Sequence, residues 1–224
     1  MIRYLRRRHF IVSAATGALV GLCTPAALAQ TKAPATPART PLLLVLGDSL
    51  SAEYGLARGT GWVALLEKQL AQDKLNVTVV NASVSGETTS GGRSRLAALL
   101  AQHKPTHVVI ELGGNDALRG LPLKNTEENL TWMTQAAQKA GAKVLLVGMQ
   151  VPPNYGTDYA NKFAGLFATV AQAQKAAVVP FLLKGVADGP DPTRLFQPDR
   201  IHPRAEAHPQ MLANVWPELK KLLR

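Results

Sequence analysis

An acid and an imidazole lie three residues apart near the end of the chain, at Asp199 and His202. This spacing lets both side chains turn toward one pocket, where the carboxylate fixes the tautomer of the histidine and stabilises its protonated form. A histidine held in this way can act as general base for a hydroxyl nucleophile, and Ser49, in the sequence G-D-S-L, directly follows an apolar run. The three residues together predict nucleophilic hydrolysis, although neither short motif is specific by itself.

Two loops between the serine and the histidine offer hydrogen-bond donors to a developing oxyanion. Gly86 stands in a stretch of small polar residues, where its N–H is open to close approach, and Asn115 in the sequence G-G-N-D offers a side-chain amide. With the N–H of Ser49 they form a predicted oxyanion hole. Each loop also has a structural interpretation, as a helix-capping segment around Gly86 and as a plain turn at Asn115.

The remaining acids and histidines near these motifs fit structural roles better. Asp48 and Asp116 are expected to hold their own loops. His103 and His107 fall at a predicted helix end and strand start, and His208 falls inside the last predicted helix, so none of them is placed to act as the base. The acid–histidine pair has no second cluster with metal-ligand spacing, and no phosphate-binding glycine motif is present. The sequence therefore predicts neither a metal nor a cofactor.

Strand-like and helix-like segments alternate along the chain from residue 42. The apolar runs predict five strands, at Leu42–Leu46, Val77–Val80, His107–Leu112, Val144–Met149 and Ala177–Phe181. The segments between and after them predict five helices, at Gly61–Gln72, Gly91–Gln102, Thr126–Ala140, Asp158–Ala176 and Pro203–Leu223. Continuous Val/Ile/Leu runs are typical of a parallel sheet buried on both faces, so we expect a three-layer α/β/α sandwich. Such folds place their chemistry at the carboxyl ends of the strands, where each motif lies.

Composition limits the protein to a few classes. With 224 residues, 46% hydrophobic and 18% charged, the chain fits one soluble globular domain, and its one cysteine excludes a disulfide framework. The formal charge of +10 is scattered, apart from four arginines in the first eight residues. Since no basic run is interleaved with aromatic residues, we expect no nucleic-acid partner.

The first 29 residues predict a cleaved signal peptide. A basic segment at Arg3–Arg8 precedes an apolar stretch at Phe10–Leu22, and Ala27-Leu28-Ala29 has the small-x-small form of a signal-peptidase site. The apolar stretch is short for a membrane span, so a permanent anchor is the weaker interpretation. Residues 30–41 predict a flexible Pro/Ala/Thr linker, and the folded domain is expected to cover residues 42–224.

Export to the periplasm or the medium follows from this signal, but the route stays open. The sequence R-R-H-F-I at Arg7 and Arg8 is similar to a twin-arginine signal, whereas it lacks the usual Ser or Thr before the pair. Twin-arginine and general secretory export are both compatible with it. Cleavage after Ala29 also removes Cys23.

The four motifs together resemble the conserved blocks of the GDSL/SGNH hydrolase superfamily. The resemblance covers nearly the whole predicted domain, and the stretches V-N-A-S-V-S-G-E-T-T, E-L-G-G-N-D-A-L-R-G and P-x-N-Y-G resemble most the bacterial periplasmic branch of thioesterase I/protease I/lysophospholipase enzymes and arylesterases. Departures stand at Val84 and Glu87, and at Glu53-Tyr54-Gly55 on the rim of the expected pocket.

The resemblance implies a flavodoxin-like fold and a serine esterase without cofactor. It implies catalytic roles for Ser49, Asp199 and His202, and oxyanion donors at Ser49, Gly86 and Asn115. It also implies an acyl pocket walled by the loops after the third and fourth strands, which contain Leu118, Pro153 and Tyr155. Its expected substrate is a small acyl ester or thioester, with possible contact to lipid substrates. Two alternatives stay open: a carbohydrate O-acetyl esterase or acetyltransferase of the same superfamily, and a non-catalytic periplasmic binding protein.

Overall fold

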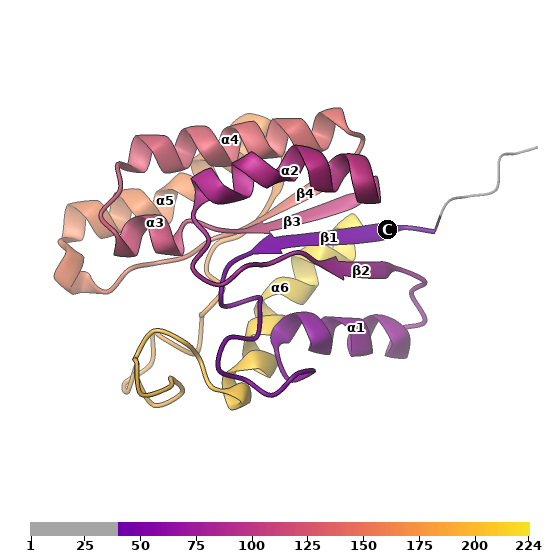
Figure 1. Ribbon diagram of the computed structural model, residues 1–224. Coiled ribbons are helices and arrows are strands. Elements are labelled where there is room, and N and C mark those ends of the chain that lie inside the picture. The colour runs from indigo at the N-terminus through magenta and orange to yellow at the C-terminus, as the bar shows by residue number, and fades with distance from the viewer. Residues whose placement is uncertain (1–39) are drawn as a thin grey trace, which may run out of the picture. The chain divides into compact units, whose positions relative to one another are not determined.

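A computed structural model describes residues 40–224, and the predicted signal peptide lies outside this part of the chain (Figure 1). Five parallel strands, in the order β2-β1-β3-β4-β5, form one sheet. The strands are β1 (Leu42–Gly47), β2 (Thr78–Asn81), β3 (His107–Glu111), β4 (Lys143–Val147) and β5 (Ala177–Val179). The helices are α1 (Trp62–Gln72), α2 (Thr89–His103), α3 (Gly114–Leu118), α4 (Leu123–Lys139), α5 (Thr157–Gln174) and α6 (His208–Leu222), with short 3-10 turns η1 (Pro153–Tyr155) and η2 (Ala205–Ala207).

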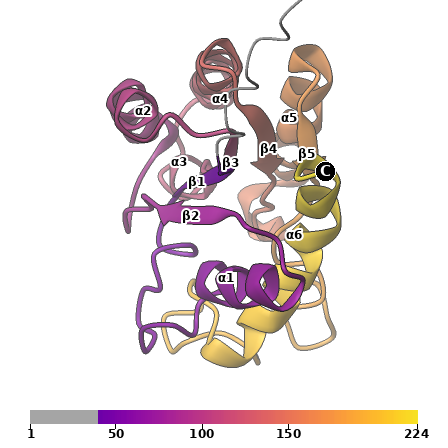
Figure 2. The same ribbon diagram turned by 90° about the vertical axis from the view of Figure 1, so that its right-hand side faces the viewer.

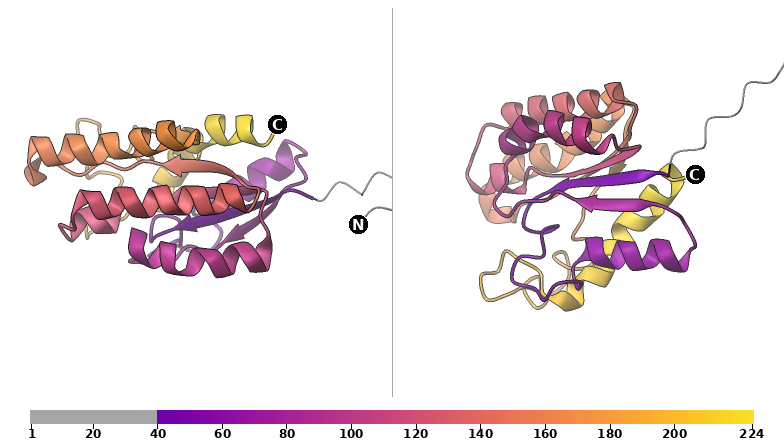
Figure 3. Two further views of the ribbon diagram at one scale, coloured as in Figure 1. Left: turned by 90° about the horizontal axis from the view of Figure 1, so that it is seen from above. Right: turned by 45° about the vertical axis from the view of Figure 1, so that its right-hand side comes forward.

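The long helices cover the sheet on both faces. Helices α2, α4 and α5 lie over one face and α1 and α6 over the other (Figures 1 and 2). Seen from above, α2, α4 and α5 run side by side, which agrees with the packing of α4 against both of its neighbours (Figure 3). The predicted three-layer sandwich is confirmed. Among the described helices, none is long and apolar enough to cross a membrane.

The centre of the sheet is buried as its apolar runs predict. All residues of β3 and all but the first of β1 are buried, because each of these strands has a strand on either side and helices above and below. The expectation of full burial is wrong for β2, whose residues are exposed or half-buried. This strand forms the edge of the sheet and pairs with β1 alone.

Several helix boundaries differ from the sequence predictions. The segment Gly114–Leu118, where a plain turn at Asn115 was the structural interpretation, forms the short helix α3. The last helix begins at His208 rather than at Pro203, because Pro203 pairs with Phe196 in an isolated antiparallel bridge. Helix α4 begins at Leu123, three residues earlier than expected. The segment before α6 is therefore longer than expected and the segment before α4 is shorter.

The parallel register brings the carboxyl ends of β1 and β3 level with one another. Gly47, the last residue of β1, lies opposite Glu111, the last residue of β3. The chain after β2 continues along β1, since Ala82 and Val84 donate their N–H groups to the carbonyls of Val45 (2.9 Å) and Gly47 (3.0 Å). Three loops that are distant in sequence thus leave the sheet together, at the end where the strands have their carboxyl ends.

Candidate active site

Ser49, His202 and Asp199 form a chain of hydrogen bonds at this edge. The Oγ of Ser49 lies 2.9 Å from the Nε2 of His202, and the Nδ1 of His202 lies 2.7 Å from the Oδ2 of Asp199. Ser49 is in the loop that follows β1, whereas the other two residues lie in the long segment between β5 and α6. The structure therefore brings together the three residues that sequence analysis singled out, across 153 positions of chain.

The protonation pattern of this chain follows from Asp199. Its Oδ1 accepts the backbone N–H groups of Ile201 (2.9 Å) and His202 (3.0 Å). Although partial burial acts to raise it, these two N–H groups and the His202 side chain lower the pKa of Asp199 to about 2. Because an ionised carboxylate only accepts, Nδ1 of His202 must carry the proton, and its bare Nε2 can accept the hydroxyl proton of Ser49.

The loop that carries Ser49 is fixed by its acidic neighbour. The Oδ1 of Asp48 accepts the N–H of Leu50 at 3.0 Å, and its other oxygen accepts the side-chain amide of Asn115 at 3.0 Å. Burial raises the pKa of Asp48 to about 6, while the N–H of Leu50 and the amide of Asn115 act in the opposite direction. Asp48 thus connects the loop after β1 to α3.

A second carboxyl group, Glu111, lies wholly buried beneath the same loop. Its Oε2 accepts the hydroxyl of Ser51 at 2.7 Å and the N–H of Asp48 at 3.4 Å, and its Oε1 has no hydrogen-bond partner in the described part of the chain. A Cβ on Gly47 would lie 2.9 Å from Oε2, so the carboxyl needs a glycine opposite it. Burial, and then the nearby charge of Asp48, raise the pKa of Glu111 well above its usual value.

Gly86 lies in the exposed loop that follows β2. Its φ of +77° belongs to the left-handed region, which glycine adopts without strain. Its carbonyl accepts the Arg119 guanidinium at 2.9 Å, while the Asn81 amide holds the start of the same loop by donating to the carbonyl of Ser51 at 2.8 Å. The loop is thus held at its start to Ser51 in the loop after β1, and at Gly86 to Arg119 at the end of α3.

Asn115 and Asp116 occupy adjacent positions on α3 but bind different parts of the fold. Asn115 is half-buried and bonded to Asp48. Asp116 is buried, and it accepts the N–H of Thr89 at 2.8 Å and a very short bond from the Thr89 hydroxyl. It therefore ties α3 to the first residue of α2, a longer-range role than the local one expected from the sequence.

None of the other described histidines has a hydrogen bond to Ser49 or Asp199 in the structure. His107 begins β3, and its Nε2 lies 3.0 Å from the carbonyl of Leu222 at the opposite end of the sheet. The Nδ1 of the buried His208 accepts the N–H of Trp62 at 3.0 Å, and burial lowers the pKa of His208. His103 is the last residue of α2.

Every large hydrophobic side chain that is exposed in the described part of the chain follows the carboxyl end of a strand. These side chains are Tyr54, Val84, Leu118, Leu121, Tyr155 and Ile201. Two of the residues predicted to bind substrate, Leu118 at the end of α3 and Tyr155 in η1, belong to this group, which we call the apolar rim. Pro153 begins η1 in the same loop as Tyr155. Exposed apolar side chains on the segments that follow the carboxyl ends of parallel strands are typical of a ligand-binding site.

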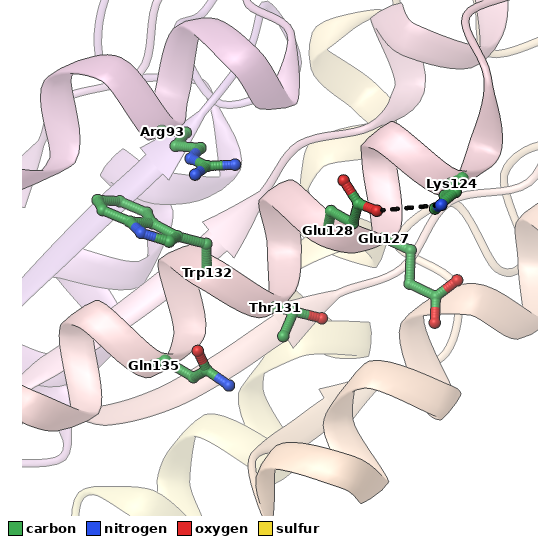
Figure 4. Close-up of a pocket in the computed structure, with 7 residues that line it drawn as sticks. All are labelled: Arg93, Lys124, Glu127, Glu128, Thr131, Trp132 and Gln135. Atoms are coloured by element: carbon green, nitrogen blue, oxygen red, sulfur yellow. Dashed lines mark ion pairs between the residues drawn. The ribbon is translucent and has the colours of Figure 1, made fainter.

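A hollow of about 470 Å³ lies elsewhere, on the outward surface of α2 and α4 (Figure 4). Its walls carry charged and polar side chains, with the Arg93 guanidinium over the ring of Trp132 and an ion pair between Lys124 and Glu128. It contains none of the predicted site residues. A second hollow, of about 430 Å³, borders the Ser49 loop and is lined by Ala52, Glu53, Leu56, Arg58, Asn81 and Ser83. Within residues 40–224, no group of three His, Cys, Asp or Glu side chains could hold a metal ion.

Sequence analysis missed three residues that contact the hydrogen-bonded chain or its loops. Glu111 carried a visible sign, because an acid at the end of a continuous apolar strand must be buried or functional. Gln197 carried no such sign, since its side-chain amide donates to the backbone carbonyls of Tyr54 and Pro203, which only the fold brings near. Tyr54 had been noted only as a departure at the rim, and its ring lies against His202.

These features define a three-layer α/β/α protein whose strand-end loops hold a serine, a histidine and an aspartate in one hydrogen-bonded chain. The chain matches the GDSL-like Lipase/Acylhydrolase family over residues 45–209 and belongs to that family. The resemblance expected from the four motifs is therefore confirmed.

Named relatives agree with this assignment. Esterase TesA of Pseudomonas aeruginosa is 52% identical over 181 residues, which cover 81% of this chain and 89% of the relative. Arylesterase of Vibrio mimicus is 42% identical with the same coverage, and thioesterase 1/protease 1/lysophospholipase L1 of Escherichia coli K12 is 41% identical over 75% of this chain and 77% of its own. The crystal structure of TesA matches with a TM-score of 0.77 over 81% of this chain and 99% of that one. The protein is an ester hydrolase of this family.

Proposed function

We propose that the protein is an exported serine esterase that hydrolyses acyl esters and thioesters through an acyl-enzyme on Ser49. The observation that carries the proposal is the continuous hydrogen-bonded chain from Ser49 through His202 to Asp199. Its geometry is that of a nucleophile, a base and a residue that orients the base.

In the first half of the reaction, the Oγ of Ser49 attacks the substrate carbonyl while the Nε2 of His202 takes its proton. The N–H groups of Ser49 and Gly86 and the amide of Asn115 bind the oxyanion of the tetrahedral intermediate. Collapse of this intermediate breaks the bond to the alcohol or thiol, which leaves with the proton from Nε2. Asp199 stabilises the imidazolium that exists between these two transfers.

In the second half, water attacks the acyl group on Ser49 and gives its proton to the same Nε2. The second intermediate expels the serine oxygen, which recovers the proton, and the free acid departs. Only His202 moves protons in both halves, so both halves depend on the same orientation of its ring.

The apolar rim supports an acyl substrate over a polar one. The relatives are named as an esterase, an arylesterase and a thioesterase/lysophospholipase, which spans alcohol and thiol leaving groups with an acyl chain in common. We infer that Leu118 and Tyr155 contact the acyl chain, and that Pro153 stiffens the loop that carries Tyr155.

A fluorophosphonate probe tests the proposal directly. We expect covalent labelling of the folded protein, with the modified peptide containing Ser49, and no labelling of Ser49→Ala. A folded wild-type protein that is not labelled at Ser49 would instead be a binding protein.

A substrate panel then defines the class. Acyl-CoA, lysophospholipid, aryl ester and acetylated sugar should be compared by kcat/KM with Ser49→Ala as blank. We expect turnover of the aryl ester and of at least one long-chain substrate. Turnover of the acetylated sugar alone would replace the proposal with a carbohydrate O-acetyl esterase.

Export rests on the first 29 residues, outside the described part of the chain. We propose cleavage after Ala29, so that mass spectrometry of the mature protein should find Gln30 first. Replacing Arg7 and Arg8 by lysine separates the routes, because loss of export would identify the twin-arginine route and unchanged export the general secretory one. Retention of residues 1–29 in the mature protein would contradict the proposal.

A further inference from the structure

The aromatic ring of Tyr54 lies against the imidazole of His202. The ring centroids are 4.3 Å apart and the planes are inclined by 37°. Tyr54 is 49% exposed, so its ring is not needed to fill the core. A large aromatic side chain held on a catalytic histidine and half in water points to a role at the site.

The backbone of Tyr54 is held at both ends. Its N–H donates to the carbonyl of Ser49 (3.3 Å), and its carbonyl accepts the Nε2 of Gln197 (3.0 Å). The same Nε2 donates to the carbonyl of Pro203 at 3.2 Å, and the N–H of Gln197 donates to the carbonyl of His202 at 2.8 Å. One glutamine therefore joins the loop of the nucleophile to the segment of the base.

The neighbouring residues Glu53 and Gly55 restrain the backbone on either side of Tyr54. Glu53 has a φ of 59°, in the left-handed region that a non-glycine residue adopts only when its surroundings impose it. Its carboxylate accepts the N–H groups of Gly59 and Gly61, both through Oε1, at 3.0 and 2.8 Å. A Cβ on Gly55 would lie 2.1 Å from the Oε1 of Gln197. The backbone of the turn thus has little freedom to carry Tyr54 away from His202.

The two hydrogen bonds of His202 leave one motion unrestrained. They hold Nδ1 to Asp199 and Nε2 to Ser49, at opposite edges of the ring, so they resist sliding of the imidazole but only weakly resist its tilting about the line through both nitrogens. A ring packed on the imidazole face resists that tilt.

We propose that Tyr54 is a positioning residue for His202. Its ring holds the imidazole in the plane in which both hydrogen bonds are straight, and its π face stabilises the imidazolium that forms when Nε2 takes the Ser49 proton. The inference rests on the proposed function and adds to it a residue that acts through the base rather than on the substrate. The aromatic ring, not the phenolic hydroxyl, carries the effect.

The test compares three variants by steady-state kinetics with a short-chain aryl ester. Tyr54→Phe should keep kcat within about two-fold. Tyr54→Leu, similar in bulk but without a π face, should lower kcat by about two- to thirty-fold, the range of a cation–π contact, with KM little changed. Tyr54→Ala should lose at least as much, and the loss should be the same for esters that differ in leaving group. Since the side chain is half exposed, the unfolding midpoint should change little.

A second variant acts on the same contact from the other side. Gln197→Ala frees the backbone of Tyr54 while keeping its ring, so it should lower kcat in the same sense. In the double variant with Tyr54→Leu, the fold-loss in kcat should be smaller than the product of the two single losses, because both substitutions disturb the same contact between Tyr54 and His202. Trp132→Leu is the matched control: it removes a ring that contacts the cationic Arg93 within the hollow of Figure 4, and kcat should not change.

Three results would overturn the inference. A raised KM with unchanged kcat would make Tyr54 a substrate contact, an equal loss in Tyr54→Phe and Tyr54→Leu would assign the effect to the hydroxyl, and unchanged kcat in Tyr54→Leu would leave the ring without a role. Labelling of wild-type Ser49 by the fluorophosphonate is measured beside them. Its absence would refute the proposed function itself, which keeps the two failures distinct.

Discussion

At the scale of single residues, Asp199 uses its two oxygens for different purposes. Oδ1 accepts two backbone N–H groups and Oδ2 faces the Nδ1 of His202. In Asp199→Asn the amide oxygen can keep the backbone bonds, but the NH₂ group then faces Nδ1 and favours the tautomer with its proton on Nε2. We expect kcat to fall by roughly 10³- to 10⁴-fold, with the unfolding midpoint nearly unchanged.

The pH profile provides a check on this role. Because the pKa of Asp199 is lowered to about 2, its carboxylate stays ionised in mildly acidic and in neutral buffer. Loss of activity in mildly acidic buffer therefore cannot come from protonation of Asp199.

If Asp199→Asn kept a tenth or more of the wild-type kcat, the role assigned to Asp199 would be wrong.

Asn115 donates one amide hydrogen to Asp48, which leaves the other for an oxyanion. Asn115→Ala should reduce kcat by two to three orders of magnitude, the usual effect of losing one oxyanion donor. Asp48→Asn should reduce kcat by about ten-fold, since its NH₂ group would face the amide of Asn115 and turn it away. Single-turnover measurement of acylation would show both effects, and near-normal acylation in Asn115→Ala would remove this residue from the oxyanion hole.

Residue types and spacing were enough to single out Ser49, Asp199 and His202, which the structure joins by hydrogen bonds, because few combinations of side chains can activate a hydroxyl group. They could not show that Asp48 holds Asn115, 67 residues away, because that contact depends on the register of β1 against β3. The same limit applies to Gln197, whose partners are backbone carbonyls.

At the scale of elements, the junction of β1 and β3 carries a buried carboxyl group. The folded protein raises the pKa of Glu111 well above 4.5, so it binds a proton that the unfolded chain releases as the pH rises past that value. By linkage, the stability contributed by the neutral form is complete at low pH and declines as the pH increases from about 4.5 toward the raised pKa.

Glu111→Gln removes this dependence while keeping an acceptor for Ser51 and Asp48. Its unfolding midpoint should match that of the wild type near pH 4 and exceed it increasingly toward pH 8. Glu111→Ala should be destabilised at every pH, by about 1 to 3 kcal/mol or more, because the Ser51 hydroxyl and the Asp48 N–H lose their acceptor. Calorimetric scans from pH 4 to 8 measure both, and a gap between wild type and Glu111→Gln that does not vary with pH would contradict the buried-proton explanation.

The order of strands and helices was predictable because continuous apolar runs and amphipathic segments have different periods. The position of each strand in the sheet was not, and β2 was wrongly expected to be buried because Val79 and Val80 resemble a central strand in composition. Helix α3 was missed because the sequence G-G-N-D favours a turn, while Asp116 stabilises the helix through its bonds to Thr89 on another element. Local sequence does not contain that partner.

At the scale of the whole molecule, the site exists only when the chain has closed on itself. Ser49 follows the first strand and His202 precedes the last helix, with every other strand formed between them. Any activity that needs both Ser49 and His202 therefore requires the complete fold, because a fragment that lacks α6 and the segment before it also lacks His202.

At the other end of the sheet, where the strands begin, Thr106 and His107 bind the first and the last element of the domain. The N–H of Leu42 donates to the Thr106 hydroxyl at 3.0 Å, and the Nε2 of His107 lies 3.0 Å from the carbonyl of Leu222. The start of β1 and the end of α6 are thus neighbours, on the side away from Ser49. A circular permutant that joins Leu222 to Leu42 by a few glycine and serine residues, and opens the chain at the exposed Gly141, should keep the wild-type kcat. The order in which the chain is synthesised would then not matter for activity, which would depend only on how the elements pack.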